Sequence, residues 1–149
     1  MSVGLLDVNM LVALAWPSHV HHRAAHAWFD ENRTGGWATC PLTQCGFVRV
    51  SSNARIIPEA VEPIEALTLL GEMVTQDHHE FWSDAIPMTG ETLPTNLLAG
   101  HGQVTDCYLL GLSIHNRGKL VTLDHRVAAL LPSGTPHANL LEIVPVQDT

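Results

Sequence analysis

Two apolar stretches of this sequence each run directly into an aspartate. "VGLLDVNM" leads to Asp7 near the start of the chain, and "GKLVTLDHR" leads to Asp124 near its end. A third aspartate, Asp106, opens the helix-like stretch "DCYLLGLSIHNR". Carboxylates brought close together repel one another and stay ionised only when a cation compensates them. A set of oxygen ligands suits Mg²⁺ or Mn²⁺, and such a site commonly activates water for attack on a phosphodiester.

Neutral oxygen atoms accompany two of these aspartates, at Asn9 and Thr122. Thr122 and Asp124 are two residues apart and point to the same face of an extended strand, so we predict that Thr122 orients Asp124 by a hydrogen bond. Each aspartate also has a structural interpretation. Asp7 and Asp124 can each cap a following helix, and Asp106 can be stabilised by the positive end of its helix dipole without any catalytic role. Spacing alone leaves both interpretations open, because a metal site requires all three to converge.

The pattern of apolar runs and turn residues predicts strands that alternate with helices. Strands are expected at residues 3–7, 37–40, 78–82, 119–123 and 140–146. Helices are expected at residues 9–16, 19–32, 41–53, 58–76 and 106–117, and Pro63 allows a later start for the fourth. Ser18 and Thr105 are predicted N-caps, Gly118 is a predicted C-cap, and residues 83–102 are a predicted loop.

This alternation predicts an α/β fold with a central parallel sheet of four to five strands, flanked by helices on both faces. We expect a single domain over residues 1–149. Ligands of such sheets sit at the carboxyl ends of the strands. Asp7 and Asp124 would therefore share one edge of the sheet, and Asp106 could reach the same edge from the start of its helix.

Charge and composition restrict the class of protein. The 149 residues carry a formal net charge of −8, with seven Lys and Arg against fifteen Asp and Glu. This balance counts against unaided nucleic-acid binding and favours a bound cation or a basic partner protein. No apolar stretch reaches the roughly 18 residues of a membrane span. Cys40, Cys45 and Cys107 are an odd number of cysteines, so we expect free, buried thiols and a cytoplasmic chain.

Four segments together carry a resemblance to a known family. They are "LLDVNMLVAL", "PLTQCGFVRVSSN", "QVTDCYLLGLS" and "LVTLDHRV", in this order along nearly the whole chain. They resemble PIN domains, specifically the VapC toxins of type II toxin–antitoxin systems. The resemblance implies a Mg²⁺- or Mn²⁺-dependent ribonuclease in which Asp7, Asp106 and Asp124 hold the metal and carry the catalysis. It also implies RNA as substrate, a cognate antitoxin as partner, and a homodimer.

The sequence departs from this family's pattern at Gln44, which stands where a glutamate is usual. Glutamine offers an amide oxygen without a charge, so binding of a second metal is weakened more than binding of the first. Gln44 is then expected to bind water or to tune the site. Arg49 and Arg126 are candidate contacts to RNA or antitoxin. The simpler interpretations are an ion pair for Arg49 and a solvated side chain for Arg126.

Gln44 also leaves open a different class of function, a PIN-like module that binds RNA or protein without cleaving it. Metal binding separates the two classes, because a pure binding module has no need of Mn²⁺. A structure-specific nuclease of the flap type is disfavoured, since the short chain lacks the helical arch that those enzymes carry.

Overall fold

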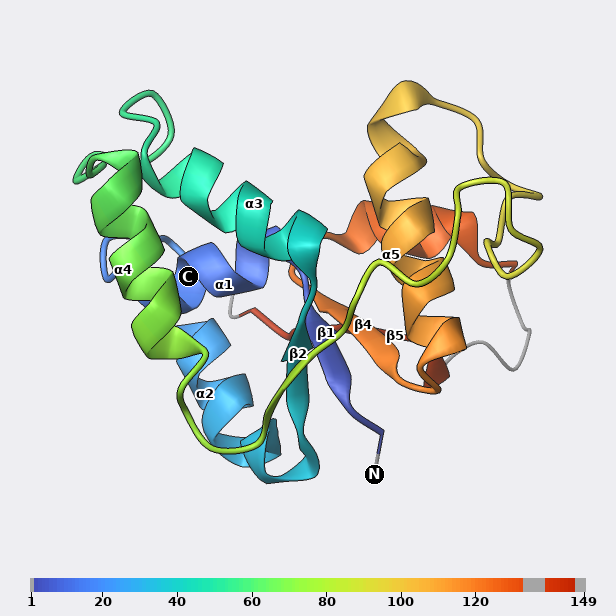
Figure 1. Cartoon of the computed structure of the whole chain (residues 1–149), viewed down its shortest axis with the longest axis horizontal. Coiled ribbons are helices and arrows are strands. Elements are labelled where there is room, and N and C mark those ends of the chain that lie inside the picture. The colour runs from blue at the N-terminus through green and yellow to red at the C-terminus, as the bar shows by residue number, and fades with distance from the viewer. Residues whose placement is uncertain (1, 133–138, 147–149) are drawn as a thin grey trace.

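The computed structural model describes residues 2–132 and 139–146 (Figure 1). Its strands are β1 (Gly4–Leu6), β2 (Trp37–Thr39), β3 (His79–Phe81), β4 (Lys119–Thr122) and β5 (Leu141–Ile143). Its α-helices are α1 (Val8–Ala15), α2 (His22–Asn32), α3 (Pro41–Ser51), α4 (Pro63–Met73) and α5 (Val104–His115). Short 3₁₀ helices are η1 (Arg33–Gly35), η2 (His101–Gln103) and η3 (His125–Leu130). The predicted alternation is confirmed, and α4 begins at Pro63.

The five strands form one parallel sheet in the order β3-β2-β1-β4-β5. Gly4 of β1 pairs with Trp37 of β2 on one side and with Lys119 of β4 on the other. The chain moves outward from β1 to β2 and β3, and then returns to the far side of β1 as β4. The strand order therefore reverses between β1 and β4, and open α/β sheets bind their ligands at such a reversal.

Successive residues of the central strands point to opposite faces of the sheet and build two cores. Leu5 and Leu120 belong to the core under α5, whereas Leu6 and Val121 belong to the core under α1 to α4. All four side chains are fully buried. Figure 1 shows α1 to α4 on one side of the sheet and α5 on the other. This alternation fixes the register of β1 and β4, and with it the position of the residues that follow them.

Two histidines close the carboxyl end of α1. Nδ1 of His22 lies 2.7 Å from the carbonyl oxygen of Ala13, and Nε2 of His26 lies 2.8 Å from that of Leu14. The last carbonyl groups of a helix have no partner within it, so these ring nitrogens satisfy two of them. The first two turns of α2 are thereby tied to the end of α1.

The predicted N-caps Ser18 and Thr105 are wrong. The Ser18 hydroxyl donates to Glu59 Oε2 at 2.6 Å, far along the sequence, and α2 begins four residues later. Thr105 lies inside the first turn of α5, because that helix begins at Val104 with Gln103 at the cap position. In both cases the helix begins at a different residue from the one that capping preferences alone predict.

The turn between α5 and β4 differs from the prediction in the residue that bends it. Arg117, not Gly118, adopts the left-handed conformation, with φ of 57°. The backbone N–H of Gly118 donates to the carbonyl of Ser113 at 2.8 Å, and this bond completes a Schellman motif. Glycine is required at 118 for a different reason, because a Cβ there would lie 2.5 Å from the carbonyl oxygen of Val3 and 2.5 Å from the ring of Trp82.

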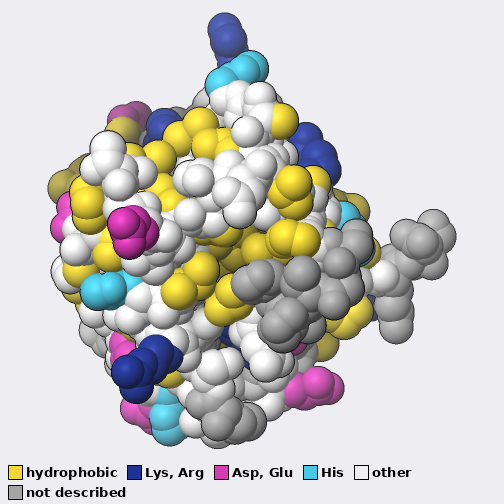
Figure 2. All heavy atoms as spheres, turned by 90° about the vertical axis from the view of Figure 1, so that its right-hand side faces the viewer, with side chains coloured by type: hydrophobic (Ala, Val, Ile, Leu, Met, Phe, Trp, Pro, Cys, Tyr) yellow, Lys and Arg dark blue, Asp and Glu magenta, His cyan; other side chains and the backbone are white. Residues whose placement is uncertain are grey.

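The predicted loop at residues 83–102 covers the same face of the sheet as α5. The Tyr108 hydroxyl of α5 donates to the carbonyl of Ile86 at 3.0 Å. Leu93 packs so closely on Gly111 of α5 that a Cβ there would come within 2.9 Å of it. Figure 2 shows hydrophobic side chains gathered on this side of the molecule. Three of the exposed hydrophobic residues in this region are Met88, Leu97 and Val104.

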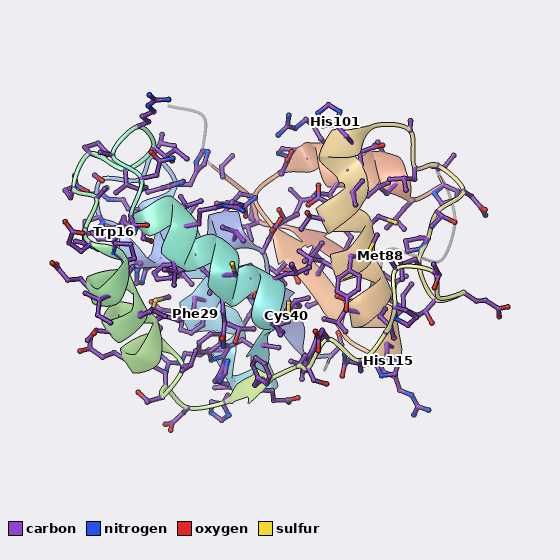
Figure 3. The ribbon with its side chains drawn as sticks, turned by 45° about the horizontal axis from the view of Figure 1, so that its top comes forward. Trp16, Phe29, Cys40, Met88, His101 and His115 are labelled. Carbon is purple, nitrogen blue, oxygen red and sulfur yellow. The ribbon has the colours of Figure 1, made fainter. Side chains whose placement is uncertain are left out.

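All three cysteines are free, as expected. Cys40, at the start of α3 (Figure 3), and Cys107 are buried, but Cys45 is exposed, which corrects the expectation that all three thiols are buried. Among the described residues, no helix has both the length and the apolar character to cross a membrane.

Candidate active site

Asp7 and Asp124 lie at the carboxyl ends of two neighbouring strands, as predicted. Asp7 directly follows β1, and Asp124 is the second residue after β4. Asp106 lies in the first turn of α5, the helix that leads into β4. Figure 3 labels His101, in the short helix just before α5, and His115, the last residue of α5, so the first turn that contains Asp106 is the end of α5 next to His101. All three carboxylates therefore belong to the region where the strand order reverses.

The Asp7 carboxylate has two fixed partners. Its Oδ1 accepts a hydrogen bond from the backbone N–H of Val8 at 2.8 Å, so the predicted role as N-cap of α1 is confirmed. Its Oδ2 accepts one from the hydroxyl of Thr122 at 2.8 Å. Burial raises the pKa of Asp7 above its usual value, these two hydrogen bonds lower it, and the charge of Asp124 raises it. One carboxylate thus caps a helix and faces a second acid.

Thr122 connects the ends of β1 and β4, but it does not orient Asp124 in the predicted way. Its hydroxyl donates to Asp7 and meets Asp124 only as the acceptor for that residue's backbone N–H, at 3.1 Å. The same oxygen accepts from Asn9 Nδ2 at 3.0 Å, and Asn9 Oδ1 accepts from the backbone N–H of Leu123 at 3.1 Å. Asn9 therefore ties the first turn of α1 to the end of β4.

Asp124 is held by one residue, Arg126. The backbone N–H of Arg126 donates to Oδ1 at 2.9 Å, which confirms Asp124 as the N-cap of η3. The guanidinium donates from Nε to Oδ1 at 3.0 Å and from Nη2 to Oδ2 at 2.9 Å. These bonds hold the pKa of Asp124 below its usual value. The Arg126 side chain is 90% exposed, which agrees with the prediction of a solvated side chain. It also forms an ion pair with Asp124.

Asp106 differs from the other two acids, because its side chain makes no hydrogen bond or ion pair with any other described residue. The pKa of Asp106 is raised to about 6, mainly by burial and then by the charges of Asp7 and Asp124, while the charge of Arg126 opposes the rise. The ionised forms of the three acids repel one another, and a bound cation would relieve this repulsion.

This raised pKa predicts a stability change in the metal-free protein. The folded chain holds the Asp106 proton up to about pH 6, whereas an unfolded chain releases it near 3.8. Stability therefore falls as pH rises through this window and levels off above it. After allowance for solvent screening, we expect Asp106→Asn to raise the free energy of unfolding by roughly 1 kcal/mol above pH 7 in EDTA. Urea denaturation at several pH values measures the difference, which should shrink toward pH 4.

Asp77→Asn is the matched control, because Asp77 is exposed and the substitution changes the net charge equally. It should leave the pH profile of stability as it is in the unmodified chain. A gain for Asp106→Asn that is the same at pH 4 and pH 7 would contradict the electrostatic explanation.

A preformed metal site is not seen within residues 2–132 and 139–146, where no group of three or more His, Cys, Asp or Glu side chains is arranged to hold a metal ion. The metal-binding roles of Asp7, Asp106 and Asp124 therefore stay predictions. The chemistry of the donors nevertheless fits a hard divalent cation. Each candidate ligand is a carboxylate, and within the part of the chain that the structure describes no cationic side chain bonds to Asp7 or Asp106.

Gln44 belongs to a hydrogen-bonded group that the sequence did not indicate. Its Nε2 donates to the hydroxyl of Thr39 at 3.0 Å, and the same hydroxyl lies 2.8 Å from Nε2 of His79. Burial lowers the pKa of His79, which favours its neutral ring, and that ring contacts Trp37 with 4.7 Å between centroids. The sequence did predict the two strands that carry Thr39 and His79. The pairing of these strands as neighbours was the information needed to place the two side chains together.

Arg49 lies exposed in the last turn of α3. The ion pairs among described residues are Lys119 with Glu142 and Arg126 with Asp124, so the expected ion pair of Arg49 is not found there. Of the two candidate arginines, Arg126 lies at the site, where it bonds to Asp124 and lowers the pKa of Asp106 through its charge.

Comparison with known proteins identifies the family. No protein-family model matches the sequence. Ribonuclease VapC39 of Mycobacterium tuberculosis is 42% identical over 142 residues, which cover 95% of this chain and 99% of that protein. Ribonuclease VapC38 of the same organism is 44% identical over 128 residues, covering 86% and 89%. The chain belongs to the VapC family of ribonucleases.

The fold of this VapC-family chain is also similar to a solved structure. It matches a chain in the crystal structure of VapBC2 from Rickettsia felis bound to a DNA fragment from their promoter, with a TM-score of 0.64. The match covers 95% of this chain and 98% of the other at 14% identity, so it supports the PIN-like fold alone. The VapC relatives are ribonucleases, which makes this chain a nuclease and outweighs the interpretation as a non-cleaving module.

Proposed function

We propose that this VapC-family nuclease is a metal-dependent endoribonuclease toxin in which Asp7, Asp106 and Asp124 hold Mg²⁺ or Mn²⁺. In this proposal residues 1–149 act as one PIN domain. The main support is the placement of three carboxylates at the carboxyl edge of β1 and β4, where the strand order of the sheet reverses. Asn9 and Thr122 support the site by fixing the ends of α1 and β4.

A divalent ion bound there supplies an activated water and positive charge that offsets the phosphodiester. The chain's own groups set the geometry. The N–H of Val8 and the hydroxyl of Thr122 hold Asp7, and the backbone N–H of Arg126 holds Asp124. Asp106, with no partner among the described residues, keeps its oxygens free for a ligand or its water shell. Carboxylates fixed in advance need little reorganisation when the reaction begins.

We further propose that a cognate antitoxin controls this activity and that the nuclease acts in the cytoplasm, where RNA is available. Support for a protein partner comes from the similar fold seen in VapBC2 and from the net charge of −8, which suits a basic inhibitory segment. Arg49 and Arg126 are the proposed contacts to RNA or antitoxin. A homodimer is proposed too, and the exposed Met88, Leu97 and Val104 are apolar side chains that a second copy could cover.

The first test is cleavage of a mixed cellular RNA pool by purified, antitoxin-free chain. We expect discrete products with Mn²⁺ or Mg²⁺ and none with EDTA, because the acids alone cannot activate water near neutral pH. Asp124→Asn should give no products. Asparagine keeps an oxygen for the N–H of Arg126, so η3 keeps its cap and the variant should fold.

Asp77→Asn serves as the charge-matched control and should cleave as the unmodified chain does, since Asp77 is an exposed residue outside the site. Folding of each variant is checked by circular dichroism before the assay. A folded, antitoxin-free chain that cleaves no RNA with either ion would overturn the proposed function.

A further inference from the structure

The guanidinium of Arg126 covers the carboxylate of Asp124. Its Nε lies 3.0 Å from Oδ1 and 3.2 Å from Oδ2, and its Nη2 lies 2.9 Å from Oδ2. With the backbone N–H of Arg126 on Oδ1 as well, both carboxylate oxygens are occupied by donors from one residue. A carboxylate is an acceptor with about four lone-pair sites, and a forked guanidinium takes the same in-plane positions that a metal ligand must offer.

We propose that Arg126 is a built-in competitor of the divalent ion: its guanidinium holds Asp124 while the ion is absent and must leave when the ion binds. The inference rests on the proposed function, because it takes Asp124 as a ligand. It adds a regulatory contact within the chain itself, separate from any antitoxin.

The contact is built so that the side chain can leave without disturbing the fold. The Arg126 side chain is 90% exposed and the Asp124 side chain 25%, so an open route into solvent exists. The cap of η3 depends on the backbone N–H of Arg126, which stays in place when the guanidinium moves away. Exposed ion pairs are worth little, so a doubly charged ion can displace the guanidinium.

Asp124 is the only one of the three acids that is held in this way within the described residues. The partners of Asp7 are a neutral hydroxyl and a backbone N–H, and Asp106 has no partner there. The other ion pair of the described chain, Lys119 with Glu142, involves the first residue of β4, at the opposite end of that strand. Arginine stays charged at all accessible pH values, so the guanidinium itself is not switched by pH.

The test is Mn²⁺ binding to the full chain by isothermal titration calorimetry, without RNA. We expect Arg126→Ala to bind Mn²⁺ about two- to fivefold more tightly than the unmodified chain, the range that an exposed ion pair allows. Arg126→Lys, which keeps the charge but loses the fork, should lie between them. Arg55→Ala removes the same charge from an exposed residue outside the site and should leave the affinity unchanged. Equal affinities for Arg126→Ala and Arg55→Ala would overturn the competition.

A second measurement follows the guanidinium itself. In the metal-free chain the Nε–H of Arg126 should give a resolved ¹⁵N–¹H signal, assigned by its loss in Arg126→Lys, because both Asp124 oxygens accept from it. Titration with Mg²⁺ should shift this signal to that of a free arginine, with the same midpoint as metal binding. If Mg²⁺ binds and the signal stays, only the competition fails. If neither Mn²⁺ nor Mg²⁺ binds at millimolar concentration, the proposed function and this inference fail together.

Discussion

Asp7→Asn is expected to reduce RNA cleavage by at least about 100-fold, because loss of groups that merely support metal ligands already costs about 10- to 100-fold. The substitution removes the buried negative charge at the end of β1 and leaves a side chain of the same shape. The measurement is the single-turnover rate of cleavage of a labelled RNA at saturating Mn²⁺, with the unmodified chain beside it.

The same substitution should not destabilise the metal-free protein. Asparagine at position 7 keeps an oxygen for the N–H of Val8, so the cap of α1 survives, but its amide nitrogen replaces the oxygen that accepts from the Thr122 hydroxyl. Burial raises the pKa of Asp7, which means that its ionised form is disfavoured in the fold, and a neutral side chain relieves this cost. This gain offsets the lost hydrogen bond from Thr122, so the melting temperature in EDTA is expected to change little. Cleavage at the unmodified rate by a folded Asp7→Asn chain would remove Asp7 from the catalytic set.

Thr122→Val is expected to affect both the site and the fold. The Thr122 hydroxyl donates to Asp7 and accepts from Asn9 and from the backbone N–H of Asp124. Valine has nearly the same shape but none of these bonds, so two donors and one acceptor lose a buried partner. We expect a loss of about 1–3 kcal/mol in the free energy of unfolding, measured by urea denaturation. Cleavage should fall by about 10- to 100-fold, since Asp7 loses the hydrogen bond that orients it.

Thr122→Ser separates the hydroxyl from the methyl group in this experiment. Serine retains the donor and both acceptor positions, so most of the activity and stability should return despite the missing methyl. If serine and valine proved equally damaging, the packing of the methyl group, and not the hydrogen bonds to Asp7 and Asp124, would explain the loss.

The three acids could be predicted from the sequence because each stands at a boundary that local pattern reveals. Asp7 and Asp124 follow buried apolar runs, and Asp106 opens an apolar helix. Alternation of strands and helices then implies a parallel sheet, whose carboxyl ends lie together. The N-cap interpretations of Asp7 and Asp124 are also right, so the structural and functional explanations are not exclusive.

The errors lie where a side chain meets a partner distant in sequence. Thr122 was expected to orient the nearby Asp124, and its oxygen does accept from the backbone N–H of Asp124, but its hydroxyl donates to Asp7, 115 residues away in the chain. Ser18 was assigned to the next helix but donates to Glu59. Gln44 was considered only as a replacement for an acid, whereas its amide bonds to Thr39 of the strand before it. Periodicity and capping rules describe neighbours along the chain, and such pairs are set by packing.

The sequence by itself determined the fold class, the family pattern and the identity of the three acids, because these depend on local hydrophobic periodicity and on residues at the ends of elements. Only the tertiary structure decided how the acids differ from one another. The pairing of β1 with β4 brings Thr122 to Asp7, the turn of η3 brings the Arg126 guanidinium to Asp124, and Asp106 is left without a partner among the described residues. Hydrogen bonds and charge interactions act over a few ångströms in space, so residues of one type at similar positions in the sequence acquire different chemistry once the chain has folded.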